Sequence, residues 1–422
     1  MKEEFLHYIW KYKLYNSRNL KTSNGHKIEI INHGTHNFDS GPDFFNAKIK
    51  IDDTIWCGNV EIHINSSDWY GHNHHTNKAF DNVILQVVFN HDREVFRTDG
   101  QLIPTMELRF DKRLLNNYEN LLQSKLWIAC EKDILKVDSI IINQWIDKLA
   151  IERLEEKSKR IDDLLQQYNN NWETAFYVQM AHNFGFKLNS EPFELLAKSL
   201  PLSYIAKHKN SLLQIEALLF GQAGFLNDTN GDEYYRSLQK EYQFLKAKFN
   251  LKPIEKHLWK FLRSRPGNFP TIRIAQFAML VFKSTALFSK IIESAKIDEI
   301  KEFFLVETSD YWKTHYQFNK ESVPKAKSVG ESSADVLIIN TIIPFLFVYG
   351  KETGSETIKQ RALDFLEKIK SEKNSITQGW RDLGVISNNA LTSQALIQLK
   401  NNYCNTKNCL NCQIGNQMIS KA

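Results

Sequence analysis

The hydrophobic pattern of this 422-residue chain changes once, near residue 114, and that change limits the folds it can adopt. Before it, apolar residues alternate with polar ones in short runs bounded by turn residues, which is typical of β-strands. After it, they recur every three or four positions, for example over 172–184 and 234–249, as on the buried face of a helix. We therefore predict an α+β protein in which a small N-terminal mixed-sheet domain precedes a larger all-helical domain. The expected boundaries are 1–112, 113–400 and, for a polar cysteine-containing tail, 401–422.

The front domain is predicted to contain one helix and several strands. The helix is expected over 4–14, where the apolar residues form a one-sided stripe. A turn at Asp52-Asp53 predicts a hairpin, and a turn at Thr98-Asp99-Gly100 predicts a second hairpin between 94–96 and 105–110. The remaining strands are expected over 27–31, 43–51, 54–64 and 83–89.

Composition and charge restrict the function classes. The chain is 42% hydrophobic and 12% aromatic, which is typical of a folded globular protein. Its net charge of +5 permits a nucleic-acid partner through a local basic patch. The acidic start of the chain and the interrupted apolar run over 336–348 predict neither a signal peptide nor a membrane span. Five cysteines are too few for a disulfide framework, so we expect a cytoplasmic protein with no membrane partner.

The strongest functional pattern in the front domain pairs two acids with a histidine. Asp43 follows Gly41-Pro42 at the start of one expected strand, and Glu61 and His63 lie on the next. Because side chains alternate along a strand, Glu61 and His63 share the face opposite the apolar residues between them. The hairpin brings Asp43 close to Glu61, and two converging carboxylates attract Mg²⁺ or Mn²⁺. His63 could then orient or activate a metal-bound water.

At these residues the front domain resembles the PD-(D/E)xK nuclease superfamily, whose fold is restriction-endonuclease-like. The resemblance covers an acid on the N-terminal helix (Glu4), the Pro42-Asp43 pair and Glu61-x-His63. It implies that Asp43 and Glu61 bind the metal and that His63 takes the place of the superfamily's lysine as the catalytic basic residue. Lys48 or Lys50, on the neighbouring strand, could supply a basic group instead. The alternative is that Asp43 only caps a turn and that the Glu61-x-His63 face is solvated.

A second cluster of polar residues follows closely. Nine of the 13 histidines precede residue 100, and His72 and His74 lie near His63 along the chain. These three imidazoles could bind Zn²⁺, which histidine often coordinates. When protonated, they could equally grip a scissile phosphate. Gln86, inside an apolar strand, needs a partner if it is buried, and could line the site or be structural.

Three of the five cysteines lie close together at the end of the chain. Close thiols in a reducing compartment are typical of metal or cluster ligands rather than of disulfides. A tetrahedral Zn²⁺ site or a [4Fe–4S] cluster needs a fourth ligand, which we expect from Cys130 rather than Cys57. The pattern is similar to that of iron-staple nucleases, in which a cluster pins the terminus to the nuclease domain. The alternative is a disordered tail in which Cys404, Cys409 and Cys412 are reduced and unligated.

A group of arginines forms a third pattern, in the helical region. Arg263, Arg265 and Arg273 flank Pro270-Thr271, which can open a helix. Gathered near a helix N-terminus, they would suit an anion such as phosphate, and nearby aromatic residues would offer stacking surfaces for single strands. The alternative is an inter-helix turn whose arginines pair with nearby acids.

Nearly the whole chain is also similar to an uncharacterised bacterial family, a so-called domain of unknown function. The similarity runs from GPDF and VEIH through RPGNFPTIRIAQ to CLNCQIG. We interpret the chain as a metal-dependent, nuclease-like phosphodiesterase acting on DNA or RNA. Two other interpretations stay open: a non-catalytic nucleic-acid-binding or scaffold protein with a degenerate nuclease-like domain, and a Zn²⁺-dependent hydrolase of a small substrate. The sequence leaves strand preference, endo or exo cleavage and oligomeric state undetermined.

Overall fold

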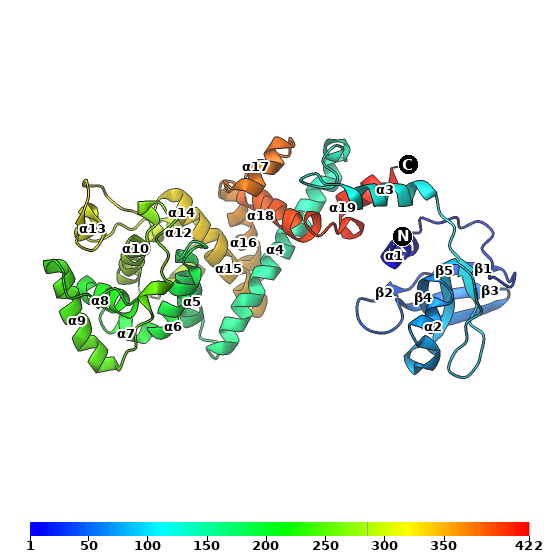
Figure 1. Ribbon diagram of the computed structural model, residues 1–422, viewed down its shortest axis with the longest axis horizontal. Coiled ribbons are helices and arrows are strands. Elements are labelled where there is room, and N and C mark those ends of the chain that lie inside the picture. The colour runs from blue at the N-terminus through cyan, green and yellow to red at the C-terminus, as the bar shows by residue number, and fades with distance from the viewer. Residues whose placement is uncertain (285, 422) are drawn as a thin grey trace. The chain divides into compact units, whose positions relative to one another are not determined.

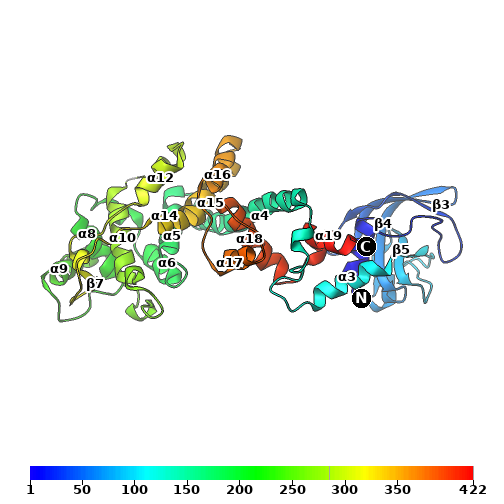
Figure 2. The same ribbon diagram turned by 90° about the horizontal axis from the view of Figure 1, so that it is seen from above.

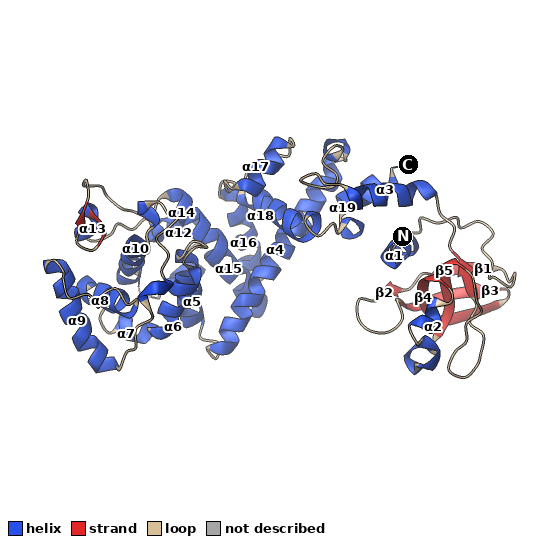
Figure 3. Ribbon diagram, in the orientation of Figure 1, coloured by secondary structure: helices blue, strands red, loops and turns tan. Residues whose placement is uncertain are grey.

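The computed structural model describes residues 1–284 and 286–421, which form two compact units. The first unit comprises Met1–Trp145 together with Leu399–Ala422, and the second comprises Ile146–Gln398. Figure 3 shows that the large sheet lies in the first unit and that the second is mostly helical. The α+β class predicted from the sequence is therefore confirmed. The two units meet along the chain at other positions than the expected boundaries near 112 and 400. The residues that follow the sheet, up to Trp145, and the C-terminal segment both pack with the sheet in the first unit.

The sheet of the first unit has six strands in the order β1-β3-β4-β5-β6, with β2 paired to β3 (Figure 1). Strand β3 is antiparallel to β1, β2 and β4, whereas β5 runs parallel to β4 and β6 runs parallel to β5. The strands are β1 (Ile28–Asn32), β2 (Thr35–His36), β3 (Phe44–Ile51), β4 (Thr54–Asn65), β5 (Val83–Asn90) and β6 (Thr105–Glu107).

The second predicted hairpin is wrong in its strand pairing. The turn at residues 98–100 does form, but it closes only an isolated bridge between Phe96 and Leu102. Strand β6 instead pairs with β5 in parallel, with Thr105 opposite Gln86. Turn residues specify only the local reversal of the chain. The pairing of β6 depends instead on the free edge of β5, and the hydrophobic periodicity does not predict which strand edge is free. The first predicted hairpin, from β3 to β4, is confirmed.

Helix α1 (Glu3–Lys11) covers one face of the sheet, because its apolar residues form a single stripe. Phe5, Leu6 and Ile9 are fully buried and share a core with Val60 and Ile62 of β4. Burial of such side chains contributes about 1.5–3 kcal/mol each relative to exposure, so this contact holds α1 against β4.

The opposite face of the sheet is covered by α2 (Asp68–Gly71) and the loop after it. Trp69 of α2 is fully buried and packs with Phe80 and Val83. Glu61 and His63 project on this side, as the alternation along β4 predicts. Because the face is covered, they are only 5% and 0% exposed, so the alternative of a solvated strand face is wrong.

The C-terminal segment is a folded part of the first unit. It contains a π-helical turn (Leu399–Cys404), a 3-10 turn (Cys409–Asn411) and helix α19 (Gln413–Ser420). Helix α19 lies beside α3 (Lys112–Gln123) in Figures 1 and 2, and Asn117 Nδ2 donates a hydrogen bond to the backbone oxygen of Ile419 at 3.2 Å.

The second unit packs its helices around an extended apolar core. Helix α5 (Trp172–Phe184) begins and ends where the sequence pattern predicts. The other helices are α4 (Ser139–Gln167), which begins in the first unit, α6 (Ser190–Ser199), α7 (Leu202–Ala206), α8 (Leu212–Gln222), α9 (Glu233–Phe249), α10 (Pro270–Lys283), α11 (Leu287–Glu293), α12 (Ile297–Phe304), α13 (Tyr311–Thr314), α14 (Glu331–Leu337), α15 (Ile343–Glu352), α16 (Glu356–Lys368), α17 (Ser375–Asp382) and α18 (Ala390–Gln398). A short hairpin, β7 (His315–Gln317) and β8 (Lys320–Glu321), follows α13.

One continuous helical stretch, Glu331–Glu352, is long and apolar enough to cross a membrane. It consists of α14, a π-helical turn (Ile338–Ile342) and α15, and 72% of its most apolar window is buried inside the protein. Asn183 Nδ2 of α5 donates hydrogen bonds to the backbone oxygen of Asn340 at 2.9 Å and to Thr341 Oγ1 at 2.8 Å, at the π-helical turn. The apolar side chains of Glu331–Glu352 are therefore part of the core of the second unit.

Glu216 of α8 is an acid buried in that core. It is 2% exposed, and its carboxyl oxygens accept hydrogen bonds from the hydroxyl groups of Tyr234 at 2.8 Å and Ser309 at 2.7 Å. Burial raises the pKa of Glu216 from 4.5 to about 7. The folded protein therefore holds this proton more tightly than the unfolded chain does. Consequently the free energy of unfolding falls as the pH rises from about 4.5 to about 7.

We expect Glu216→Gln to remove this pH dependence. At pH 5 the variant and the parent should differ little, whereas at pH 8 the variant should be more stable by up to about 3 kcal/mol, since one pKa unit corresponds to about 1.4 kcal/mol. Urea unfolding at the two pH values measures the difference. Glu356→Gln, at an exposed position of α16, is the control and should show no comparable change. An equal effect of Glu216→Gln at both pH values would contradict the prediction.

Candidate metal centre

Asp43 and Glu61 are neighbours across the β3–β4 strand pair. Phe44 lies opposite Val60 in the ladder, which places Asp43 beside Glu61. The backbone N–H of Asp43 donates to Glu61 Oε2 at 3.1 Å, and the backbone N–H of Ile62 donates to Asp43 Oδ2 at 2.8 Å. The structure thus brings together the two acids that the hairpin pattern paired.

Helix α1 adds two residues that the sequence patterns did not single out. Glu3 and His7 are one helical turn apart and share a face of the helix. His7 Nε2 lies 3.3 Å from Asp43 Oδ2, and one ligand atom each of Glu3, His7 and Asp43 all lie within 4.8 Å of one another. Glu4, the acid expected on this helix, is exposed on another face. The i, i+4 spacing of Glu3 and His7 was the signal that could have found them.

The chain after β4 brings three histidines together. His72 follows α2, and His74 begins a 3-10 turn (His74–Thr76). One ring nitrogen each of His63, His72 and His74 lies within 4.8 Å of the other two. Asn73 between them has a left-handed backbone, with φ of 60°, which bends the loop back on itself. His74 Nε2 is 3.1 Å and His63 Nε2 is 3.7 Å from Glu61 Oε1. Glu61 therefore connects the histidine group with the carboxylate group beside α1.

The buried acids and His63 have opposite pKa shifts, whereas His7 shifts in the same direction as the acids. Burial, together with the charge of Asp43, raises the pKa of Glu61 to about 9 and that of Glu3 to about 7. Burial lowers the pKa of His63 to about 3, so His63 is neutral near pH 7 and is not a cationic phosphate ligand. For His7, burial is outweighed by the hydrogen bond and charge of Asp43, so its pKa is raised. Such buried acids hold their protons near neutral pH unless a cation displaces them.

Gln86 determines which nitrogen of His63 carries the proton. The amide nitrogen of this fully buried residue donates to the Ser66 carbonyl at 3.1 Å and to His63 Nδ1 at 3.2 Å, and its oxygen accepts from Thr105 Oγ1 at 3.2 Å. The Ser66 carbonyl can only accept, so the amide nitrogen must face it. His63 Nδ1 is therefore an acceptor, and neutral His63 carries its proton on Nε2, which donates to His72 Nδ1 at 3.3 Å and lies 3.7 Å from Glu61 Oε1. In this arrangement His63 is a hydrogen-bond donor at the site rather than a metal ligand through Nε2.

A cleft of about 640 Å³ opens beside His7, between α1 and the C-terminal segment of the same unit. Its charged lining residues include Lys2, Lys11, Lys407 and Glu4. Tyr12 and Phe38, which also line it, are 44% and 78% exposed, and Lys11 Nζ lies 5.5 Å and 5.9 Å from their ring centroids. The cleft therefore offers positive charge and exposed aromatic side chains next to the carboxylate group.

Lys48, the expected substitute for the missing basic residue, lies away from these groups. It is exposed on β3 opposite Cys57, four residues before Glu61 on β4. At about 3.4 Å per residue, this separates it from Glu61 by about 14 Å along the strand. Lys48 therefore does not stand in for a lysine at position 63.

The three arginines of the second unit do not form one surface group. Arg273 is 5% exposed, its guanidinium donates hydrogen bonds to Asn268 Oδ1 at 2.6 Å and to Gln276 Oε1 at 3.0 Å, and burial lowers its pKa to about 10. It is an internal structural cation. Arg263 and Arg265 are exposed on the preceding turn.

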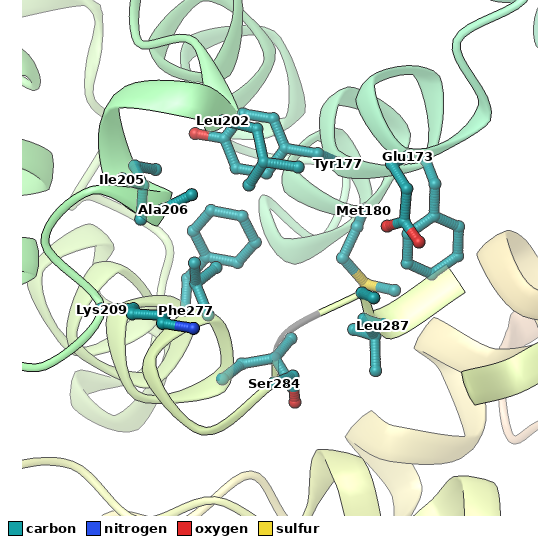
Figure 4. A pocket seen from close by; sticks show the side chains of 14 residues that line it. Glu173, Tyr177, Met180, Leu202, Ile205, Ala206, Lys209, Phe277, Ser284 and Leu287 are labelled. Carbon is teal, nitrogen blue, oxygen red and sulfur yellow. The ribbon is translucent and has the colours of Figure 1, made fainter. Parts of the chain in front are cut away.

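The second unit also contains an apolar cavity of about 400 Å³ between α5, α7 and α10 (Figure 4). Phe277, Met180 and Leu202 are among the side chains that face it, and Glu173 and Lys209 lie at its sides. Glu173 Oε1 accepts hydrogen bonds from the backbone N–H and the hydroxyl group of Ser289, both at 3.1 Å. Such a lining suits an apolar group rather than a phosphate backbone.

The chain belongs to the family described as "Protein of unknown function (DUF2851)", which matches residues 3–375. The match includes the sheet, both residue groups around Glu61 and most of the second unit. It confirms the similarity to a domain-of-unknown-function family seen in the sequence. No curated protein and no solved structure is significantly similar to the chain.

Proposed function

We propose that this member of the DUF2851 family is a metal-dependent phosphodiesterase that cleaves DNA or RNA. The observation that carries the proposal is the convergence of Asp43 with Glu61 across two strands and with Glu3 and His7 of α1. Carboxylate oxygens dominate this set, and such ligands suit Mg²⁺ or Mn²⁺. The acid-bearing helix, the Pro-Asp pair before β3 and the Glu-x-His pattern on β4 support the resemblance to PD-(D/E)xK nucleases.

The residues at the site would have separate roles. Asp43, Glu3 and His7 would hold the cation, with Glu61 beside them. A divalent ion bound there polarises a phosphate group and lowers the pKa of a coordinated water. The Nε2–H of His63, 3.7 Å from Glu61 Oε1, would donate a hydrogen bond to the attacking water or to a phosphate oxygen. His63 would thus supply the donor that the superfamily's lysine provides.

The cleft beside His7 supports a polyanionic substrate. Phosphate groups are attracted by lysines such as Lys2 and Lys11, and the exposed rings of Tyr12 and Phe38 can stack on unpaired bases. Each such stacked base contributes about 1–3 kcal/mol. A single strand, whose bases are free to stack, therefore fits this lining better than a duplex does.

The histidine trio favours a second candidate, a Zn²⁺-dependent hydrolase of a small substrate. His63, His72 and His74 form the nitrogen-rich group that such a site needs. The hydrogen bond from Gln86 opposes this reading, since it leaves the proton of His63 on the nitrogen nearest the other two rings. We therefore rank this function below the phosphodiesterase.

Cleavage assays with the full chain test the proposal. Labelled single-stranded DNA, duplex DNA and RNA are incubated with Mg²⁺, Mn²⁺, Zn²⁺ or a chelator. We expect cleavage with Mg²⁺ or Mn²⁺ and none with chelator. Asp43→Asn should weaken Mn²⁺ binding by at least about tenfold, since even outer-shell partners of metal ligands contribute 10–100-fold. Asp53→Asn, at the exposed β3–β4 turn, is the matched control and should behave as the parent.

The outcomes separate the candidate functions. Nucleic-acid binding without cleavage under any metal would favour the non-catalytic alternative and overturn the proposal. Ester hydrolysis that requires Zn²⁺ and spares nucleic acids would favour the histidine-centred hydrolase. Equal Mn²⁺ affinity of Asp43→Asn and the parent would remove Asp43 from the metal site.

A further inference from the structure

Four of the five cysteines belong to one region of the first unit, where the C-terminal segment packs against the chain that follows the sheet. Cys130 lies in the turns after α3, and Cys404 ends the π-helical turn. Cys409 begins the last 3-10 turn, and Cys412 precedes α19. Cys57 is exposed on β4 and does not belong to this group.

Contacts on both sides of these cysteines fix the C-terminal segment in place. Lys407 Nζ donates a hydrogen bond to the backbone oxygen of Leu122, and Lys400 Nζ lies 4.8 Å from the ring centroid of Trp127. The rings of Trp145 and Tyr403 pack edge to face with centroids 5.2 Å apart. Segments that are far apart in the sequence thus bring Cys130 to the three C-terminal thiols.

Cys412 is held in place just before the last helix. It is only 7% exposed, its backbone N–H donates to the carbonyl oxygen of Cys409 at 3.3 Å, and its carbonyl oxygen accepts from the backbone N–H of Asn416 at 2.8 Å. A side chain at position 415 would place its Cβ 2.3 Å from the backbone oxygen of Cys409, so glycine permits this close approach.

The thiols lie in largely buried surroundings. Cys409 and Cys412 are only 8% and 7% exposed, and Cys130 packs against the core cluster of the first unit that contains Cys409. Cysteines bind a metal or cluster as thiolates, whose charge the bound metal neutralises.

We propose that Cys130, Cys404, Cys409 and Cys412 bind an iron–sulfur cluster. The spacing Cys-x₄-Cys-x₂-Cys with a distant fourth cysteine is one that holds such clusters. Zinc fits less well, because sulfurs of a tetrahedral Zn²⁺ site lie about 3.8 Å apart, as follows from Zn–S bonds of about 2.3 Å. Among the described residues, the groups of three ligand atoms within 4.8 Å of one another include none of these thiols.

The cluster has a structural role that does not depend on chemistry at Asp43 and Glu61. It joins the turns after α3 to the C-terminal segment, whose residues from Asn408 to Asn411 line the cleft beside His7. Loss of the cluster is therefore expected to release the segment, including the contact between Asn117 and Ile419.

The test is the metal content of the full chain after anaerobic purification. We expect visible absorbance, with iron and acid-labile sulfide in equal amounts and at least two of each per chain, as [2Fe–2S] and [4Fe–4S] clusters require. Cys130→Ser and Cys412→Ser should lose most of both, whereas Cys57→Ser, the matched control, should retain them. Limited trypsin digestion should cut near Lys400 and Lys407 in the two ligand variants before it does so in the parent.

Several results would overturn the proposal. Stoichiometric zinc without sulfide would replace the cluster with a zinc site, and a metal-free parent that also fails to incorporate iron and sulfide on anaerobic reconstitution would exclude both. If the ligand variants do not fold, the parent's iron-to-sulfide ratio and its electron paramagnetic resonance spectrum after reduction decide the matter. Nuclease activity without iron would leave the function standing and remove the cluster, so the two proposals can fail separately.

Discussion

Glu61→Gln is expected to reduce metal-dependent cleavage by about 10³-fold or more, with little change in the fold. Glutamine keeps the size of the side chain and an oxygen that can accept from the Asp43 backbone N–H. It cannot carry the negative charge that attracts a divalent cation. A metal supplies several kcal/mol of transition-state stabilisation, and 1.36 kcal/mol corresponds to a tenfold change in rate. Single-turnover cleavage at saturating Mg²⁺ measures the loss.

The pH dependence of metal binding gives an independent check on Glu61. Because its pKa is raised to about 9 in the metal-free protein, a cation must displace a proton from it at lower pH. The Mn²⁺ affinity of the parent should therefore increase from pH 6 to pH 9, and that of Glu61→Gln should increase less. Glu29→Gln, at an exposed position of β1, is the control for both measurements. Cleavage by Glu61→Gln within a factor of about three of the parent would remove Glu61 from the reaction.

His63→Ala is expected to reduce cleavage by about 10²–10⁴-fold while leaving Mn²⁺ affinity nearly unchanged. The reason is that His63 is assigned as a donor through Nε2 and not as a ligand, and positioned acid–base groups contribute a factor of this size. His63→Lys should retain more activity than His63→Ala, because an ammonium group also donates hydrogen bonds. Rates and metal affinities measured on the same preparations distinguish the two roles.

Gln86→Glu tests the same assignment without touching the imidazole. A carboxylate at position 86 accepts a hydrogen bond from Nδ1, which moves the proton of neutral His63 away from Nε2. We expect a loss of cleavage approaching that of His63→Ala. If His63 is instead a metal ligand, His63→Ala will weaken metal binding, and Gln86→Glu will strengthen it by freeing Nε2. Circular dichroism establishes that the variants are folded.

Several parts of the fold and the site followed from local sequence patterns. The period of α5 predicted both its ends, because helical spacing and burial agree along the whole element. The alternation along β4 placed Glu61 and His63 on one face, and the Gly-Pro turn placed Asp43 at the start of the partner strand. These inferences succeeded because each depends only on residues that are close together in the sequence.

Other parts depended on the exact phase of an element or on burial. Glu4 was expected at the site, but the packing of Phe5, Leu6 and Ile9 turns Glu3 and His7 towards Asp43 instead. Arg273 resembles Arg263 in the sequence, yet one is buried and the other exposed. A one-residue change in helix phase rotates a side chain by about 100°, and neither that choice nor burial is encoded in composition.

By itself, the sequence determined the division into a strand-rich front and a helical remainder, the β3–β4 hairpin and the pairing of its two acids. It also set the spacing of the three C-terminal cysteines. Only the tertiary structure decided that α1 contributes Glu3 and His7 and that the covered sheet face buries Glu61 and His63. The physical reason is that periodicity and turn residues act over a few positions, whereas convergence of distant segments depends on which faces bury each other.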